Sequence, residues 1–231
     1  MIPQDKQTLL DFLNPYQPFD FMGSLRYSTL VAGLRDCRIN TKRDITTGVY
    51  NPDIQHGDEG NWLSAIGYFT ILDQMGSCYK PVAEPEPQAN ANTIKFVIEK
   101  FGFDLVDNDD RELNALIALR NAFTHDFNLL NIPINPDMVN LQQHKFTVTA
   151  ESENNWIVKL PTRLWDGNID GKDFYDTSDS TFINLFGLGN LTETIYSRIC
   201  DLLTADNIDL RLSTIRLINK YTFVTSDHPI K

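Results

Sequence analysis

The stretch "IALRNAFTHDFNLL", from Ile117 to Leu130, continues a helical pattern but places polar residues where a core would be expected. The preceding "DNDDRELNA" begins with acidic residues, which favour a helix N-terminus, and goes on in strong helix formers. At helical spacing one stripe of this segment consists of Leu113, Leu116, Ile117, Arg120, Phe123, Thr124 and Phe127. A guanidinium on a core-facing stripe is costly unless it is ion-paired, reaches water or lies in a polar cleft. The segment therefore predicts a polar cleft beside Arg120.

The neighbouring face of the same predicted helix is small and polar. It consists of Asn114, Ala118, Asn121 and His125. Asn121 and His125 are four residues apart, so we expect their side chains to lie one above the other. The long stem of Arg120 allows its charged head to reach that face. One cleft could therefore hold a cation, an amide and an imidazole.

A second helix, predicted over "NWLSAIGYFTILDQMG" and ending before Gly76, carries a similar polar intrusion. Its apolar stripe of Trp62, Ile66 and Phe69 continues to Asp73. We therefore hypothesise that Asp73, or another acid of this helix, pairs with Arg120 inside the helical core.

The run from Arg120 to His125 resembles the Arg-x4–6-His motif of the HEPN superfamily (higher eukaryotes and prokaryotes nucleotide-binding domains), with Asn121 at the position where that family often has a polar residue. The resemblance implies an all-α bundle. It also implies a metal-independent ribonuclease of a toxin–antitoxin, defence or RNA-processing system, because many members have that activity. Such members usually form homodimers in which two copies of the motif face each other. The acidic balance of this chain and its β-rich segment depart from the family pattern.

The resemblance also assigns roles to individual residues. His125 would act as general base or acid, and Arg120 would bind the scissile phosphate. Asn121 would orient the histidine or the phosphate. Asp126 would raise the pKa of His125 or accept surface hydrogen bonds. We expect no cofactor and no metal. The alternative is a non-catalytic helical module for nucleotide binding or protein interaction, in which the motif serves stability alone.

The rest of the chain leads us to expect a mainly α fold: a HEPN-like helical bundle forming a single domain over residues 1–231. Further helices are predicted over "SLRYSTLVAGLRDCRI" with Ser24 as N-cap, "TIKFVIEKFG" with Gly102 as C-cap, "TFINLFGLGNLTETIYSRICDLL" and "NIDLRLSTIRLINKY". The alternation in "HKFTVTAESENNWIVKL" predicts a β-hairpin, within a β-containing insertion of about residues 140–175.

Composition limits the classes of partner. The formal net charge is −11, which argues against a broad electrostatic grip on duplex DNA, although RNA and an antitoxin or regulatory protein remain candidate partners. We expect the short basic clusters, such as the one containing Arg38 and Arg43, to be solvated helix faces or ends, with a local phosphate-binding patch as the alternative.

Composition also bears on the compartment. Apolar residues make up 42% of the chain, which is sufficient for a packed core. No apolar run reaches the roughly 18 residues that span a bilayer, and the first residues do not resemble a secretory signal. The three cysteines are odd in number, far apart and in no Cys-x-x-Cys spacing, which favours a reducing compartment. We therefore expect a cytoplasmic protein.

Overall fold

The computed structural model of the chain describes residues 3–15, 17–58, 60–88, 91–104, 106, 110–126, 128–170 and 172–224. Within these ranges, the side chains of residues 3, 4, 125, 126, 136, 140, 141, 172 and 173 are not described. The α-helices in chain order are α1 (Pro3–Phe12), α2 (Thr29–Asn40), α3 (Trp62–Cys78), α4 (Thr93–Phe101), α5 (Asp110–Asn121), α6 (Val139–Gln142), α7 (Leu185–Thr204) and α8 (Thr214–Tyr221). The strands are β1 (Phe19–Phe21), β2 (Ser24–Ser28), β3 (Tyr79–Pro81), β4 (Leu130–Asn131), β5 (His144–Thr149), β6 (Val158–Lys159), β7 (Thr181–Asn184), β8 (Ile208–Leu210) and β9 (Thr222–Val224).

Helix α3 lies at the centre of the helical part and contacts α2, α4 and α7. It begins where the Asn61 side chain accepts a hydrogen bond from the backbone N–H of Ser64, which satisfies one donor of the first turn. Helix α7 is the longest helix of the described chain, and it begins in the same way after Asn184. More than half of the residues of α3 and of α7 are buried, so these two helices provide much of the core.

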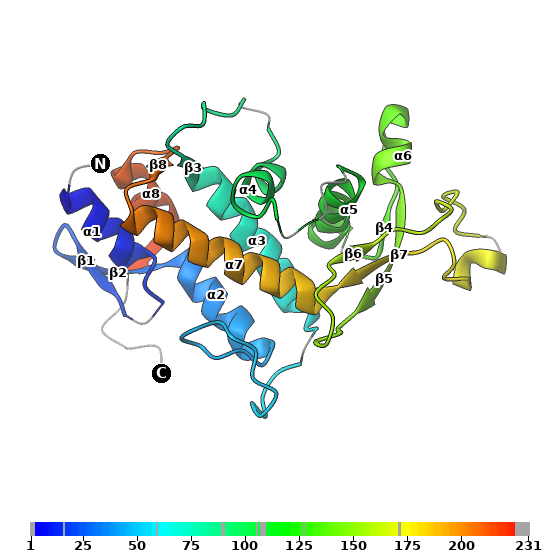
Figure 1. Cartoon of the computed structure of the whole chain (residues 1–231), viewed down its shortest axis with the longest axis horizontal. Coiled ribbons are helices and arrows are strands. Elements are labelled where there is room, and N and C mark those ends of the chain that lie inside the picture. Colours follow the sequence, from blue (N-terminus) through cyan, green and yellow to red (C-terminus); the bar gives the residue numbers. More distant parts are fainter. Residues whose placement is uncertain are drawn as a thin grey trace.

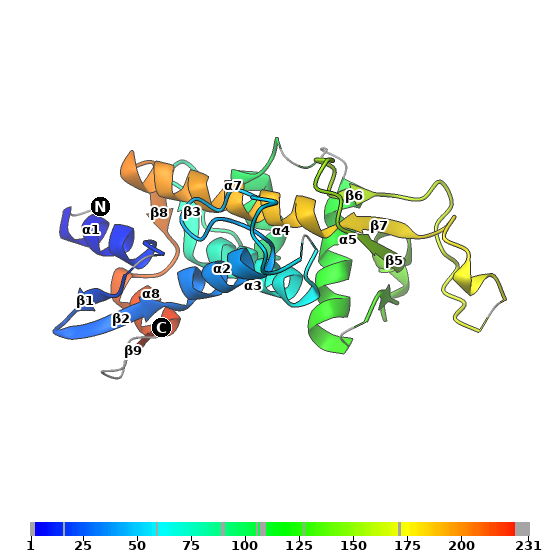
Figure 2. The ribbon, with the colours of Figure 1, turned by 90° about the horizontal axis from the view of Figure 1, so that it is seen from below.

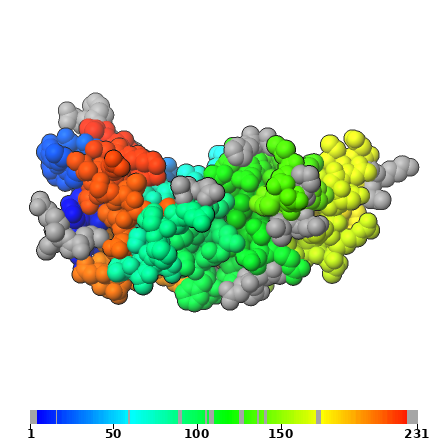
Figure 3. Space-filling view, turned by 90° about the horizontal axis from the view of Figure 1, so that it is seen from above, coloured from blue at the N-terminus to red at the C-terminus, as the bar shows by residue number. Residues whose placement is uncertain are grey.

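The strands form three sheets at different places along an elongated molecule (Figures 1 and 3). An antiparallel sheet of order β1-β2-β9 lies at one end, near α1 and α8. Strands β3 and β8 form a small pair that links the ends of α3 and α7. A four-stranded sheet of order β4-β5-β7-β6 lies towards the other end, beyond α5 (Figure 2).

Helix α5 lies between the helical core and the four-stranded sheet. It contacts α4 on one side and β4, β5 and β6 on the other. Five consecutive residues, 115–119, are therefore buried, because two layers cover the helix from different directions. The predicted small polar face of this helix is wrong at Ala118, which is completely buried.

The expectation of a mainly α bundle is wrong, because the fold is mixed α/β, with helices and three sheets. The difference comes from short strands at the ends of segments that were expected to be wholly helical. Ser24–Ser28 forms β2, and the helix begins only at Thr29, with Ser28 as its N-cap in place of Ser24. Thr181–Asn184 forms β7, directly before α7.

The predicted β-hairpin is wrong in its pairing, although both of its strands are present, as β5 and β6. Strands β5 and β6 do not pair with each other; both pair with β7, which lies between them. The β5–β7 pairing is parallel, with Phe146 opposite Thr181. A parallel pair needs a crossover connection instead of a tight turn, which the alternation of apolar and polar residues cannot reveal. The sheet also extends past the predicted insertion boundaries of about 140 and 175. Strand β4 lies before the first boundary, and β7, which leads directly into α7, lies after the second.

Candidate functional site around Arg120

Helix α5 ends at Asn121 and is followed without a break by a π-helical turn over Ala122–Asp126. A π-turn closes its hydrogen bonds over five residues instead of four, so it changes the direction in which later side chains point. The prediction of one α-helix through Arg120 and His125 is therefore wrong beyond Asn121, because Ala122–Asp126 is π-helical. Such turns occur frequently at functional sites. The side chains of His125 and Asp126, and residue Phe127, lie outside the described part of the structure.

The side chain of Arg120 lies at the edge of the core, with 31% of it exposed. Its Nη2 is 3.6 Å from Oδ2 of Asp73, and its Nη1 donates a hydrogen bond of 3.2 Å to Oδ1 of Asn121. The hypothesised pairing of Asp73 with Arg120 is therefore present. It lies at a partly solvated position, not inside the core, since Asp73 is also 38% exposed.

Asp73 has a second partner at the start of another helix. The hydroxyl of Thr93, the first residue of α4, donates a hydrogen bond to Oδ1 of Asp73. The two carboxylate oxygens of Asp73 thus point to two different groups, one on α4 and one on α5. Thr93 was missed in the sequence, because its hydroxyl lies 20 residues away from Asp73 along the chain and nothing local indicates the contact.

Aromatic side chains hold the π-turn against α3. The centroid of the Phe123 ring lies 4.3 Å from that of the Trp62 ring. It lies 6.3 Å from the centroid of the Phe69 ring, in an edge-to-face arrangement. Phe123 is fully buried, whereas the neighbouring Thr124 is exposed and bonds the carbonyl oxygen of Arg120. Large buried rings of this kind contribute strongly to packing, so the turn that carries His125 is well anchored in the core.

A second polar centre, also missed, lies between α2, α7 and the loop after α2. Arg38 and Arg43 were expected to be solvated, but both are buried. Arg38 pairs with Glu193 through two hydrogen bonds, and Arg43 donates to the side chain of Asn190 and to the carbonyl oxygen of Gly48. Burial raises the pKa of Glu193, and the contact with Arg38 opposes that rise. These contacts hold the loop after α2 on α7, so we regard this centre as structural.

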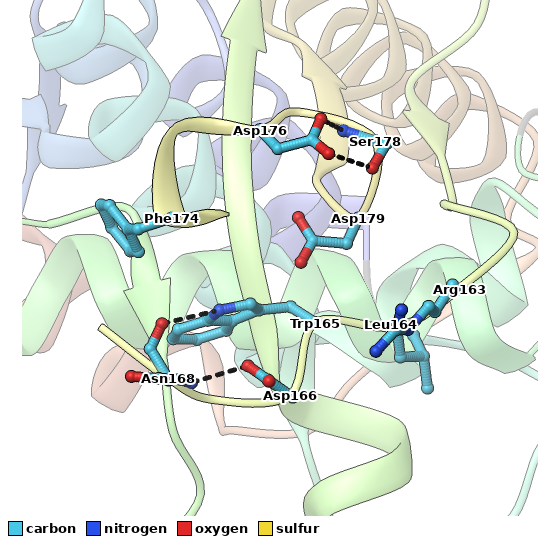
Figure 4. Close-up of a pocket in the computed structure, with 9 residues that line it drawn as sticks. All are labelled: Arg163, Leu164, Trp165, Asp166, Asn168, Phe174, Asp176, Ser178 and Asp179. Atoms are coloured by element: carbon cyan, nitrogen blue, oxygen red, sulfur yellow. Dashed lines mark hydrogen bonds between the residues drawn. The ribbon is translucent and has the colours of Figure 1, made fainter. Parts of the chain in front are cut away.

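A hollow of about 180 Å³ lies in the segment between β6 and β7 (Figure 4). Trp165 lies at its centre, with the carboxylates of Asp166 and Asp179 on either side of the ring. The acidic groups already have partners: Asp176 accepts hydrogen bonds from Ser178, and Asp179 is 2.5 Å from Nζ of Lys145. The acidic groups of the hollow are therefore explained by contacts within the protein, and the hollow is a weaker candidate for a functional site than the surroundings of Arg120.

Comparison of the chain with models of known protein families, with curated proteins and with solved structures gives no significant match. Within the described part of the chain, no helix has both the length and the apolar character needed to cross a membrane.

Proposed function

We propose that this chain is a metal-independent endoribonuclease that uses Arg120, Asn121 and His125, and that it acts as a cytoplasmic homodimer in a toxin or defence setting. The proposal rests on the likeness of the motif to that of HEPN ribonucleases. The observation that carries it is the state of Arg120: the guanidinium is held at the protein surface by Asp73 and Asn121, directly before the π-turn that contains His125. A held and partly exposed arginine is well suited to bind a phosphodiester.

The chemistry needs only groups of the RNA and of these side chains. The ribose 2′-oxygen attacks the adjacent phosphorus and loses its proton to a general base, while the bond from phosphorus to the 5′-oxygen breaks. A general acid returns a proton to that leaving oxygen, so the products are a 2′,3′-cyclic phosphate and a 5′-hydroxyl. His125 is suited to either proton transfer, because an unperturbed imidazole titrates near neutral pH. Arg120 would stabilise the charge that gathers on the phosphate oxygens.

A homodimer would provide both proton-transfer groups. A single chain contributes one His125, which can serve as base or as acid in one turnover step. Two copies facing each other across a shared groove would supply a second His125 for the complementary role. An antitoxin or another regulatory protein would then act by covering that groove.

The second candidate is a non-catalytic module in which the motif serves binding or stability alone. It is favoured by the fact that Arg120 already has two protein partners, and by the net charge of −11, which weakens affinity for any polyanion. The two candidates differ in what they predict for RNA cleavage.

The test is cleavage of a labelled single-stranded RNA by the purified chain in excess EDTA. We expect cleavage with a 2′,3′-cyclic phosphate end, detected by mass spectrometry, and a loss of about 10²–10⁴-fold in rate for His125→Ala. His56→Ala, which removes an exposed histidine outside the motif, should retain full activity. Intact RNA with the wild-type chain, or equal cleavage by His125→Ala, would refute the enzymatic proposal.

A further inference from the structure

Thr93, Asp73 and Arg120 form a chain of polar contacts across three helices. The Thr93 hydroxyl donates to Oδ1 of Asp73, and Oδ2 of the same carboxylate faces Nη2 of Arg120 at 3.6 Å. A carboxylate with a partner on one oxygen has a fixed orientation of the other oxygen. The position of the guanidinium therefore depends on a hydroxyl that does not touch it.

The backbone around Thr93 explains why this hydroxyl is itself held in place. Gly76 of α3 faces the start of α4, and a Cβ atom at Gly76 would clash with the carbonyl oxygen of Thr93. The absence of a side chain thus allows the first turn of α4 to lie directly against α3. Asn92 caps this turn by accepting a hydrogen bond of 3.0 Å from the backbone N–H of Lys95. Thr93 is consequently fixed by both its own helix and the neighbouring helix.

We propose that Thr93 is a positioning residue for the phosphate-binding guanidinium of Arg120, and that it acts through Asp73. The role in RNA binding rests on the proposed function; the positioning of Arg120 does not. An arginine has five N–H donors in a rigid planar fork, so the contacts of Nη2 with Asp73 and of Nη1 with Asn121 fix the plane of the guanidinium and the directions of its remaining N–H groups. Loss of the Thr93 hydroxyl frees the carboxylate to rotate, and the guanidinium then samples several orientations.

The opposite effect is also physically conceivable and provides the sharpest test. If Asp73 mainly competed with phosphate for Arg120, release of the carboxylate would strengthen the binding of an anion. If Asp73 positions Arg120, the same release weakens it. The sign of the change therefore separates the two roles.

The first experiment needs no RNA. The ¹⁵N signal of the Arg120 Nε–H group is assigned by its loss in Arg120→Lys and is then followed in Thr93→Val and Thr93→Ser. We expect Thr93→Val, which keeps the shape but removes the hydroxyl, to shift and broaden the signal, and Thr93→Ser to retain it. An unchanged signal in a folded Thr93→Val variant would overturn the positioning role. Should Thr93→Val fail to fold, Asp73→Asn is measured in its place.

The second experiment measures binding of a short single-stranded RNA that is methylated at every 2′-oxygen and cannot be cleaved by its own 2′-hydroxyl. We expect Thr93→Val to weaken binding roughly tenfold, as for the loss of a charged hydrogen bond. The slope of log affinity against log salt should fall in magnitude by about 0.7, the value for one phosphate contact on a single strand. Thr204→Val is the matched control, because the Thr204 hydroxyl bonds a carbonyl oxygen of its own helix α7, that of Cys200.

The outcomes of the two experiments keep the proposals apart. Tighter binding by Thr93→Val overturns the positioning role and shows that Asp73 competes with phosphate. No binding by the wild-type chain, together with the expected change in the Arg120 signal, overturns the proposed function and leaves the positioning of Arg120 intact.

Discussion

Arg38 on α2 and Glu193 on α7 form a buried ion pair with two parallel hydrogen bonds, of 2.9 Å from Nε and 2.7 Å from Nη2 of the guanidinium. The arginine also donates to the carbonyl oxygens of Ile45 and Thr46. Its side chain is 2% exposed and that of Glu193 is 11% exposed. This pair joins two helices of the core to the loop that follows α2, and its removal should affect the whole fold.

We predict that Arg38→Met lowers the free energy of unfolding by about 3–5 kcal/mol, because it leaves the Glu193 carboxylate buried without its cation. Denaturant unfolding followed by circular dichroism measures this change. Arg38→Met combined with Glu193→Leu should recover most of the loss. The comparison is Lys6→Met, which breaks the partly exposed surface pair with Asp206 and should cost no more than about 1 kcal/mol. Equal effects of Arg38→Met and Lys6→Met would contradict the structural role of the buried pair.

Two glycines in helices should respond to alanine with opposite signs. At Gly76 a Cβ atom would meet the Thr93 carbonyl oxygen, so Gly76→Ala should destabilise the protein by about 1–3 kcal/mol through overpacking. At Gly33 of α2 the nearest atoms to a Cβ are those of Ile71, at 4.0 Å, so Gly33→Ala should stabilise by up to about 1 kcal/mol through helix propensity. Thermal unfolding of both variants checks the prediction. A stabilising Gly76→Ala would show that α4 does not lie as closely on α3 as described.

The three thiols should be unreactive in the folded protein. Burial raises the pKa of Cys37 and Cys78 to about 12 and that of Cys200 to about 11, from an ordinary value of 9.0. At pH 8 the thiolate fraction of even Cys200 is then about a hundredfold below that of an unfolded thiol, so alkylation by iodoacetamide should be slowed at least by that factor. Intact mass spectrometry, with and without guanidinium chloride, measures it. Fast labelling of the native chain would contradict the burial of Cys37 and Cys78 and the partial burial of Cys200.

The same pKa shifts make folding sensitive to alkali. The folded state keeps these protons to a higher pH than the unfolded state does. The contribution to stability is therefore fully present below pH 9 and is lost as the pH rises from about 9 towards 11 and 12. Denaturant midpoints should fall over this pH range, and Cys37→Ala should make the midpoint fall less steeply with pH.

An acid-side prediction concerns Asp104, whose carboxylate bonds Arg198 of α7. Hydrogen bonding to Arg198 lowers the pKa of Asp104 below its ordinary value of 3.8. Its contribution to stability is therefore present above about pH 3.8 and is lost as the pH falls through the lower folded value. Carboxyl NMR titration should show the lowered midpoint, and Arg198→Gln should return it to the ordinary range. A midpoint that does not move in Arg198→Gln would exclude Arg198 as the cause.

Helical periodicity correctly indicated the long helices around the candidate site. The helix from Trp62 was predicted, although it continues through Gly76 to Cys78 instead of ending before Gly76. The short helix from Thr93 was predicted with its cap at Gly102, because such segments bury one face and their pattern is local. The pairing of Asp73 with Arg120 could also be predicted, since each residue interrupts an apolar stripe and the two opposite charges need partners. The roles of Arg120, Asn121 and His125 in catalysis remain a prediction.

The short strands next to helices, such as β2, β3 and β8, could not be predicted, because their partners lie far away along the chain. Arg26 of β2 is opposite Val224 of β9, and Tyr79 of β3 is opposite Leu210 of β8. Segments of three to five residues have no periodicity of their own that outweighs a neighbouring helix. Their extended form is stabilised by hydrogen bonds that exist only once the helices have brought both strands together.

The sequence by itself determined where the amphipathic helices lie and which polar residues needed partners, because both follow from local spacing and from the cost of burying charge. Only the tertiary structure decided the mixed α/β fold, the π-turn over Ala122–Asp126, the burial of Arg38 and Arg43, and the contact of Thr93 with Asp73. Each of these depends on groups brought together from distant parts of the chain, and pairing energies over such distances leave no pattern in the local sequence.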